Sequence, residues 1–274
     1  MVSDREKRRN LEKTVSDLQD RWGRQSIKRL KDHRLEFPHL STGFENLDEI
    51  LGIGGLPSGR ISELTGRPTS GITTLALQVA AKFQSTGGIV LYFDHCHTFD
   101  AEYAVNCGVE LEQLVLVRPH DLQQAAEILL DLIIGGGRNL IIFETTLSEL
   151  SQSQAVQRLS TTLDQLIAPL GKSGSTLIFL TSTSPLSTNE IYSSTSDEFS
   201  ANEPDKRGNF FNSLRHYASV RLEIQRSEWI YKGQEIKGYR SKVQVKKNKV
   251  APAGKVCTIS ISVHQGELNG INKP

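Results

Sequence analysis

The sequence is poor in cysteine, methionine and tryptophan, with three, one and two of them among its 274 residues. Cys96, Cys107 and Cys257 lack the number and spacing of a disulfide framework or a structural zinc site, which indicates a reducing compartment. No run approaches the roughly 18 apolar residues of a membrane-spanning helix, and the charged start MVSDREKRRN is not followed by the apolar stretch of a secretory signal. We therefore expect a cytoplasmic protein without a membrane partner.

Charge is unevenly distributed along the chain, although the formal net charge is only +1. Residues 1–34 carry 11 Lys or Arg and 6 Asp or Glu, residues 226–255 carry 9 and 2, and residues 35–225 carry 11 and 22. The three segments therefore have charges of +5, +7 and −11. Basic ends attract polyanions or the acidic faces of other subunits, whereas a solvated basic face needs no partner.

The first segment has the periodicity of an amphipathic helix. Leu11, Val15, Leu18 and Trp22 are spaced 4, 3 and 4 residues apart, which places them on one helix face, and Gly23 offers a stop. A helix with only four apolar anchors must pack on its own domain or on a neighbouring subunit.

Beyond residue 40, short apolar runs alternate with segments of helical length. The runs occur at residues 61–65, 89–94, 140–144 and 176–181. Helical patterns between them include residues 121–134 and 152–170. Continuous apolar strands separated by helices predict an α/β fold with a mostly parallel, twisted sheet that helices cover on both faces.

Residues 183–213 interrupt this alternation, because they are rich in Ser, Thr, Asn and acids and have no period. They predict a long mobile loop. Antiparallel strands that close the sheet are predicted at 217–226, 238–249 and 256–263. We expect residues 1–34 to form a helical oligomerisation segment and residues 35–274 to form the core.

Residues 66–74 read GRPTSGITT between a predicted strand and a predicted helix. Gly66, Gly71 and Thr73 have the spacing of the phosphate-binding pattern G-x4-G-K-[ST], whose backbone N–H groups cradle phosphates and whose hydroxyl binds Mg²⁺. The lysine position holds Ile72. Without the lysine the pattern is weak, and a helix-capping loop explains it equally well.

Together with longer stretches elsewhere, this loop gives the chain a resemblance to the bacterial RecA recombinases. The matching stretches are residues 17–30, 40–80, 93–109, 216–226 and 243–252. The resemblance covers roughly residues 11–265 and implies a RecA-like phosphate-loop core, an N-terminal polymerisation helix, ATP and Mg²⁺ as ligands, and a place in DNA recombination, DNA repair or the SOS response. No counterpart of the family's small C-terminal domain precedes Pro274, which argues against a self-sufficient strand-exchange enzyme.

The resemblance also identifies positions that have lost their chemistry. The phosphate-loop lysine is replaced by Ile72, the catalytic glutamate by Cys96, and the glutamine that senses the γ-phosphate by Ser182. The acid that assists Mg²⁺ through water is Glu144 instead of aspartate. Isoleucine cannot offset phosphate charge and a thiol is a poor general base, so we expect no retained catalytic residue and lost or impaired ATP hydrolysis.

Residues for binding nucleotide are better retained. By resemblance, Thr73 is the Mg²⁺ ligand, Asp100 and Tyr103 contact adenine, and Lys247 and Lys249 reach a neighbouring subunit's ATP. Both lysines also suit an exposed strand edge kept soluble by charge. The implied nucleotide-binding set is Gly66, Arg67, Pro68, Thr69, Ser70, Gly71, Ile72, Thr73, Thr74, Asp100, Tyr103 and Glu144.

The two loops that hold single-stranded DNA in the family are altered. The first is much shortened, and the second, within 183–213, has five acids against Lys206 and Arg207. Phe210 and Phe211 replace the family's paired glycines. Their rings either stack on unpaired bases or pack beneath the loop, and we favour packing. DNA binding through these four residues is a hypothesis.

Three functions remain open from the sequence. The favoured one is a RecA-like protein that binds nucleotide weakly or at subunit interfaces and joins or regulates nucleoprotein filaments, by self-association or with a recombinase. One alternative is an active DNA-dependent ATPase and recombinase that binds ATP and single-stranded DNA. The other is an accessory protein of translesion synthesis, similar to ImuA, with a polymerase-type partner.

Overall fold

The computed structural model describes residues 3–23, 27, 37–146, 153–182 and 208–262. The chain divides into two units, Met1–Glu36 and Phe37–Pro274, each of which is described by itself. A helix with the length and apolarity needed to cross a bilayer does not occur among the described residues.

The first unit contains α1 (Asp4–Trp22), which begins earlier than the apolar periodicity predicts. Ser3 caps it by accepting a hydrogen bond from a backbone N–H group of the first turn, and the chain leaves the helix at Gly23, where φ is positive. None of its residues is buried, and the side chains of Leu11 and Trp22 are both 64% exposed. The apolar face of α1 therefore contributes little burial within the first unit.

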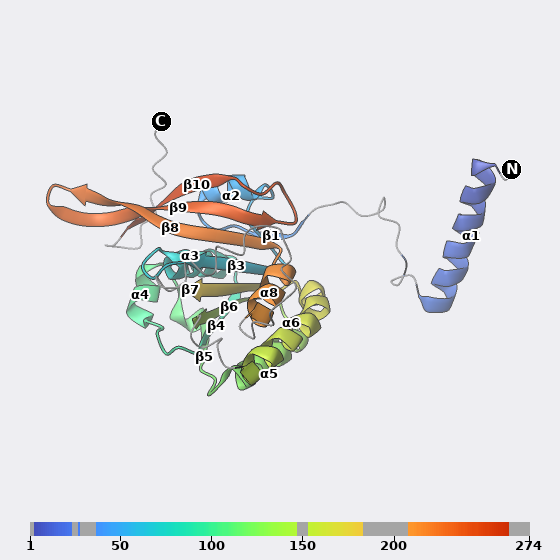
Figure 1. Ribbon diagram of the computed structural model, residues 1–274, viewed down its shortest axis with the longest axis horizontal. Helices are drawn as coiled ribbons and strands as arrows, with labels where there is room; N and C mark the ends of the chain where they lie inside the picture. Colours follow the sequence, from blue (N-terminus) through green and yellow to red (C-terminus); the bar gives the residue numbers. More distant parts are fainter. Residues whose placement is uncertain (1–2, 24–26, 28–36, 147–152, 183–207, 263–274) are drawn as a thin grey trace. The chain divides into compact units, whose positions relative to one another are not determined.

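An eight-stranded, mostly parallel sheet is the centre of the second unit (Figure 1). Its strands are β3 (Ile61–Gly66), β4 (Ile89–Asp94), β5 (Leu114–Val117), β6 (Asn139–Thr146), β7 (Thr176–Ser182), β8 (Val220–Lys232), β9 (Glu235–Asn248) and β10 (Val256–Ser262). The order across the sheet is β10-β9-β8-β3-β7-β6-β4-β5, and β9 runs antiparallel to both of its neighbours, β8 and β10. The fold class expected from the sequence is confirmed.

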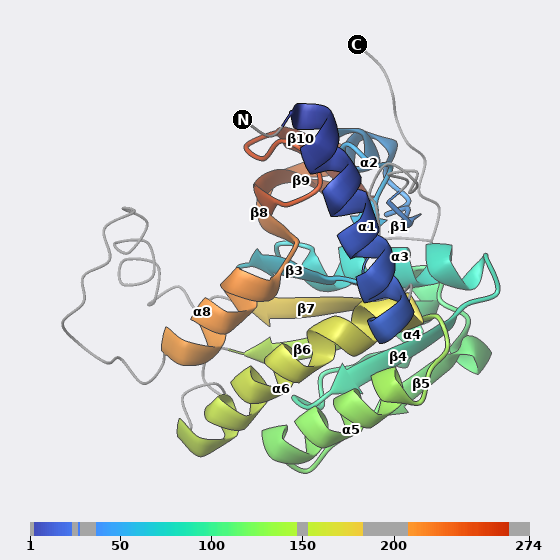
Figure 2. The ribbon, with the colours of Figure 1, turned by 90° about the vertical axis from the view of Figure 1, so that its right-hand side faces the viewer.

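Helices cover both faces of this sheet. They are α2 (Glu45–Leu51), α3 (Ile72–Gln84), α4 (Ala101–Asn106), α5 (Leu122–Ile134), α6 (Ser153–Ser173), α8 (Gly208–Tyr217) and a 3₁₀ turn at Leu111–Gln113. Residues of α2, α3 and α4 share one buried cluster, and residues of α5, α6 and α8 share the other. Figure 2 shows α5, α6 and α8 side by side on their face of the sheet. A separate two-stranded sheet pairs β1 (His39–Leu40) with β2 (Leu56–Pro57).

Strand β7 shows why the apolar runs are continuous instead of alternating. Ile178 and Leu180 belong to the cluster under α3, whereas Leu177 and Phe179 belong to the cluster under α6. Successive side chains of a strand point to opposite faces, so a strand buried on both faces requires apolar residues at every position.

The loop predicted over residues 183–213 is wrong at its C-terminal end, because α8 begins at Gly208. Phe210 and Leu214, one helical turn apart, are both fully buried beside the sheet, and their burial supports a helix that local composition disfavours. Residues 183–207 lie outside the described residues, so the rest of that prediction stays a prediction.

A row of aromatic rings anchors α8 to the sheet. Phe93 stacks on Phe143 at 5.2 Å between ring centroids, Phe143 lies 5.2 Å from Phe179, and Phe179 meets the edge of Phe210 at 5.9 Å. All four side chains are fully buried. The row therefore couples α8 to three adjacent parallel strands.

We expect Phe210→Ala to lower the free energy of unfolding by about 3–5 kcal/mol, because it leaves a cavity at the end of this row. Urea denaturation monitored by circular dichroism measures the change. Ile134→Ala is the control, since Ile134 is 61% exposed and its loss changes stability by less than about 0.5 kcal/mol. A cost for Phe210→Ala below about 1 kcal/mol would contradict the packing described.

Candidate functional site

The loop between β3 and α3 has a backbone suited to holding an anion. Gly71 adopts φ 101°, and a Cβ atom there would lie 2.6 Å from Cδ1 of Ile261. No side chain caps the first turn of α3, so its N–H groups can serve an anionic ligand. The Ser70 hydroxyl is buried and has no hydrogen-bond partner among the described residues. These features fit a phosphate group held by backbone and hydroxyl donors.

Ile72 occupies the lysine position but packs into the protein core. Its side chain is 7% exposed and belongs to the cluster beneath α3. Its Cγ2 atom lies 3.1 Å from the point where a Cβ on Gly66 would sit. Position 72 therefore contributes no positive charge to the loop. The positively charged side chain of the loop is that of Arg67, which is exposed. The site fits a phosphate but lacks the loop charge that phosphoryl transfer uses.

Tyrosines from two elements border the start of α3. The Thr74 hydroxyl shares a hydrogen bond of 2.5 Å with the Tyr103 hydroxyl and a longer one of 3.5 Å with that of Tyr239. Asp100 caps α4 by accepting from the Tyr103 backbone N–H at 3.0 Å, so both predicted adenine contacts belong to one turn. Burial raises the pKa of Tyr103 to about 12, which keeps its hydroxyl protonated.

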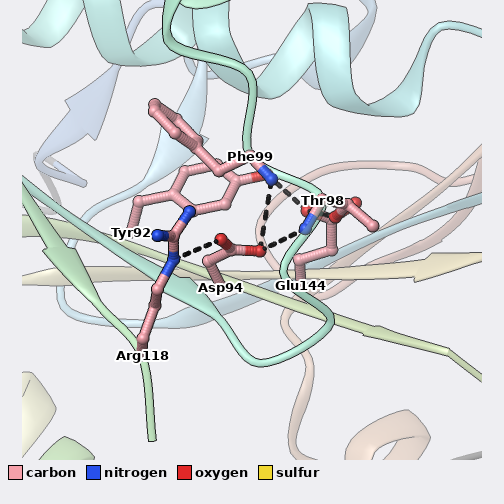
Figure 3. A network of polar contacts seen from close by, with 6 residues as sticks. All are labelled: Tyr92, Asp94, Thr98, Phe99, Arg118 and Glu144. Atoms are coloured by element: carbon pink, nitrogen blue, oxygen red, sulfur yellow. Dashed lines mark hydrogen bonds and ion pairs between the residues drawn. The ribbon is translucent and has the colours of Figure 1, made fainter.

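The carboxyl ends of β4 and β6 carry a network of acids and their donors (Figure 3). Asp94 is fully buried, accepts from the Thr98 backbone N–H at 2.8 Å, and pairs with the Arg118 Nε at 3.0 Å. Glu144 accepts from the Tyr92 hydroxyl at 2.7 Å and from the Thr98 hydroxyl at 3.2 Å. Burial, and then the charge of Glu144, raises the pKa of Tyr92, so the phenol remains a donor. Glu144 is thus held in a fixed orientation at the carboxyl ends of the parallel strands, which we call the carboxyl edge of the sheet.

The other altered positions follow the same edge. Ser182 ends β7 and pairs in register with Gly66, the first residue of the loop, whereas Cys96 follows β4 and is half-buried. Thr73 is half-buried in the first turn of α3. No group of three or more His, Cys, Asp or Glu side chains among the described residues could hold a metal ion. Any Mg²⁺ at this edge would rest on the Thr73 hydroxyl, on Glu144 through water, and on phosphate oxygens.

Lys247 and Lys249 bind the C-terminus of α8. The Lys249 Nζ donates to the His216 carbonyl at 2.8 Å, and the Lys247 Nζ donates to the carbonyls of Arg215 and His216, the latter at 3.0 Å. Lysines at this end of a helix satisfy its last carbonyls and its dipole. The hypothesis that both lysines only keep an exposed strand edge soluble is therefore incomplete, because both ammonium groups have hydrogen-bond partners in the structure.

Register places these lysines far from the loop of their own chain. Lys247 pairs with Arg221, and Arg221 pairs with Glu63 near the amino end of β3. The loop begins only after Gly66, about 10 Å further along that strand and on the opposite edge of the sheet. The Nζ atoms bind the C-terminus of α8, at the amino ends of the parallel strands.

Of the four predicted DNA contacts, the described residues include the side chain of Phe210 alone. Phe210 is fully buried against Phe179, so its ring packs in the core and offers no stacking surface. Lys206, Arg207 and the side chain of Phe211 lie outside the described residues. Their role stays a prediction.

Comparison with known proteins decides the family. The family model for the RecA N-terminal domain matches residues 9–268. The chain belongs to the RecA family. Protein RecA of Herpetosiphon aurantiacus is 33% identical over 273 residues, which cover 95% of this chain and 73% of that protein. For protein RecA of Desulfotalea psychrophila the values are 34%, 275 residues, 96% and 74%, and for that of Staphylococcus aureus 31%, 276 residues, 96% and 76%.

The sequence alone indicates the RecA-family resemblance but not several residues of the site. Tyr92 and Arg118 hold the two acids, and Ser241 donates to the Ser70 carbonyl at 2.7 Å. The position of Asp94 at the end of an apolar run is a signal for that acid. The position of Arg118 just after the neighbouring strand is a signal for its partner. No local pattern marks Ser241, because its contact depends on how β9 lies over the loop.

Lys247 gives a pH-dependent prediction. Burial, with the charges of Lys249 and Arg221, lowers its pKa from 10.5 to about 8, and Glu63 opposes this shift. Between these values the unfolded chain binds more protons at this lysine than the folded chain, so Lys247 adds stability as pH rises from 8 to 10.5.

We expect the stability of the wild type relative to Lys247→Met to rise by about 1 kcal/mol between pH 7.5 and 9.5, after allowing for solvent screening. Urea denaturation at several pH values measures this difference, which cancels titrations common to both proteins. Lys82→Met, which alters an exposed lysine of α3, is expected to give a flat difference. A flat result for Lys247→Met as well would show that this lysine is not desolvated.

Proposed function

We propose that this RecA-family protein acts in DNA recombination or repair by joining or regulating RecA-type filaments, with ATP hydrolysis lost or strongly impaired. The observation that carries the proposal is the burial of Ile72 in the apolar core at the lysine position of the phosphate loop. In this proposal the protein binds nucleotide and Mg²⁺ as structural ligands.

The proposed loss of hydrolysis follows from electrostatics. Phosphoryl transfer depends on positioned charges that offset those of the phosphates, and losing one such group costs about 10²–10³ in rate. Here the loop lysine is Ile72, and the position of the general base is Cys96. Gly66 to Gly71 would hold phosphates by their backbone, Thr73 would bind Mg²⁺, and Tyr103 would contact the adenine. A bound nucleotide supplies the phosphates that these groups orient.

The proposed assembly follows from the polarity of the sheet. The phosphate loop lies at the carboxyl edge, and Lys247 and Lys249 lie at the amino edge. If the lysines of one copy bind the nucleotide of the next, the contact is head-to-tail, and such contacts build filaments when the rotation does not close a ring. Single-stranded DNA enters the proposal as a component of that filament. The exposed apolar side chains of α1 give a second contact by which subunits can associate.

We expect the wild type to turn over ATP at least about 100-fold more slowly than a RecA recombinase on the same single-stranded DNA, because loop charge and base are both missing. Phosphate release measures turnover, and equilibrium dialysis measures nucleotide binding. The double change Ile72→Lys with Cys96→Glu is expected to raise turnover at least about tenfold.

The matched control for this experiment is Ile72→Met with Cys96→Gln, which has similar volumes and no added charge. Circular dichroism melting shows which variants remain folded, since a lysine at the buried position 72 needs a phosphate partner. Brisk turnover by the wild type, unchanged by the charged pair, would support the active recombinase and exclude the proposal.

A second prediction concerns α1. We expect Leu11→Gln with Trp22→Gln to weaken self-association, or incorporation into RecA filaments, by at least about tenfold, because two of the four apolar anchors are removed while the helix is retained. Sedimentation velocity with nucleotide and single-stranded DNA measures the effect. Lys13→Gln, an exposed change on the same helix, is the control. Equal assembly by all three proteins would remove α1 from the interface.

A further inference from the structure

A pocket of about 640 Å³ lies at the amino ends of the parallel strands, whereas the phosphate loop lies at their carboxyl ends. Its lining includes the residues that immediately precede β3, β6 and β8, namely Arg60, Arg138 and Ser219. This volume is within the range of sites that bind small molecules or short peptide segments.

The lining of this pocket carries three cations and no carboxylate. Lys249 already donates to the carbonyl of His216. The Arg60 guanidinium lies 5.8 Å from the ring centre of Phe37 and makes a long 3.5 Å hydrogen bond to the Ser219 hydroxyl. Neither Arg60 nor Arg138 is paired with an acid of the described residues. Two guanidinium groups therefore retain capacity for carboxylate or phosphate oxygens.

The remaining lining is apolar or accepts hydrogen bonds. Ile167 and Leu170 of α6 contribute apolar surface, and the Ser58 hydroxyl is buried without a partner among the described residues. Two helices also end here, since Gly171 belongs to the last turn of α6 and Tyr217 is the last residue of α8. The last carbonyl groups of a helix carry partial negative charge and lack hydrogen-bond donors within the helix.

This combination favours a peptide over a phosphate-rich ligand. A phosphate cluster brings only acceptors, which cannot satisfy the terminal carbonyl groups of the two helices. A peptide brings carboxylates for the arginines, N–H groups for the carbonyls and an apolar side chain for the wall of Ile167 and Leu170. The chain's own residues 24–36, which precede the pocket residue Phe37, have five Lys or Arg against two Asp or Glu and are thus of the wrong charge.

We propose that this amino-edge pocket binds an acidic peptide segment of a partner protein, with carboxylates on Arg60 and Arg138 and an apolar side chain against α6. The pocket lies at the opposite ends of the strands from the phosphate loop of the same chain, and it shares Lys249 with the proposed contact to a neighbour's nucleotide. It gives the protein a means of recognising a partner through a short motif.

The test uses the full chain and a fluorescein-labelled peptide, acetyl-Asp-Glu-Phe-Ser-Asp-Glu-amide, followed by fluorescence anisotropy. We expect Arg60→Gln and Arg138→Gln each to weaken binding about tenfold, as for the loss of a charge-assisted hydrogen bond. Arg60→Lys retains the charge and should lose less, which separates recognition from misfolding. Lys82→Gln removes one exposed charge elsewhere and should bind as the wild type does.

Four further results would overturn the proposal. The first is equal binding of the uncharged peptide acetyl-Asn-Gln-Phe-Ser-Asn-Gln-amide, which would remove the role of the carboxylates. The second is unchanged binding after replacing the peptide's phenylalanine with serine, which would leave only nonspecific charge attraction. The third is displacement of the peptide by stoichiometric pyrophosphate or ADP, which would make the pocket a phosphate site. Absence of peptide binding to the folded wild type would overturn it directly.

Discussion

The parallel direction of the central strands is the constraint on which the rest of the structure depends. Because β3, β4, β6, β7 and β8 all run the same way, every loop at their carboxyl ends meets at one edge, and every strand start meets at the other. The phosphate loop, the two held acids and Ser182 share the first edge. The cationic pocket, Lys247 and Lys249 share the second. The chain thus presents two chemically different ends, and a head-to-tail contact is the arrangement that brings them together.

The carboxyl edge is unusual in its balance of charge. Asp94 and Glu144 are both held in place, by Arg118 and by the hydroxyl of Tyr92, while the loop contributes Ile72 where a lysine would offset the phosphates. A nucleotide at this edge would meet fixed negative charge with little compensation from the same chain. Compensation would then have to come from Mg²⁺, from the exposed Arg67 or from a neighbouring copy. In the proposed function, this balance would link nucleotide binding to assembly more closely than to hydrolysis.

Much of this fold could be predicted from local pattern, but the parts that depend on distant contacts could not. The apolar runs that became β3, β4, β6 and β7 are visible in the sequence because both of their faces are buried. Helix α8 was missed in its first half because Ser and Asn are weak helix formers, and it is supported by burial of Phe210 under α6 and the sheet. In the site, the loop and Glu144 could be located from spacing and resemblance. The Tyr92–Glu144 bond joins residues 52 positions apart and follows only from strand register.

The hydrogen bonds of Lys247 and Lys249 connect subunit assembly with the position of helix α8. In the isolated chain both ammonium groups serve the carbonyls that end α8, and partial burial lowers the pKa of Lys247 to about 8. A phosphate is a stronger acceptor than a peptide carbonyl and favours the charged lysine. If a neighbour's nucleotide takes these lysines, the C-terminus of α8 loses its cap, and this helix directly follows residues 183–207. Assembly through nucleotide would then alter the support of the segment that corresponds to the family's second DNA loop, with no hydrolysis required.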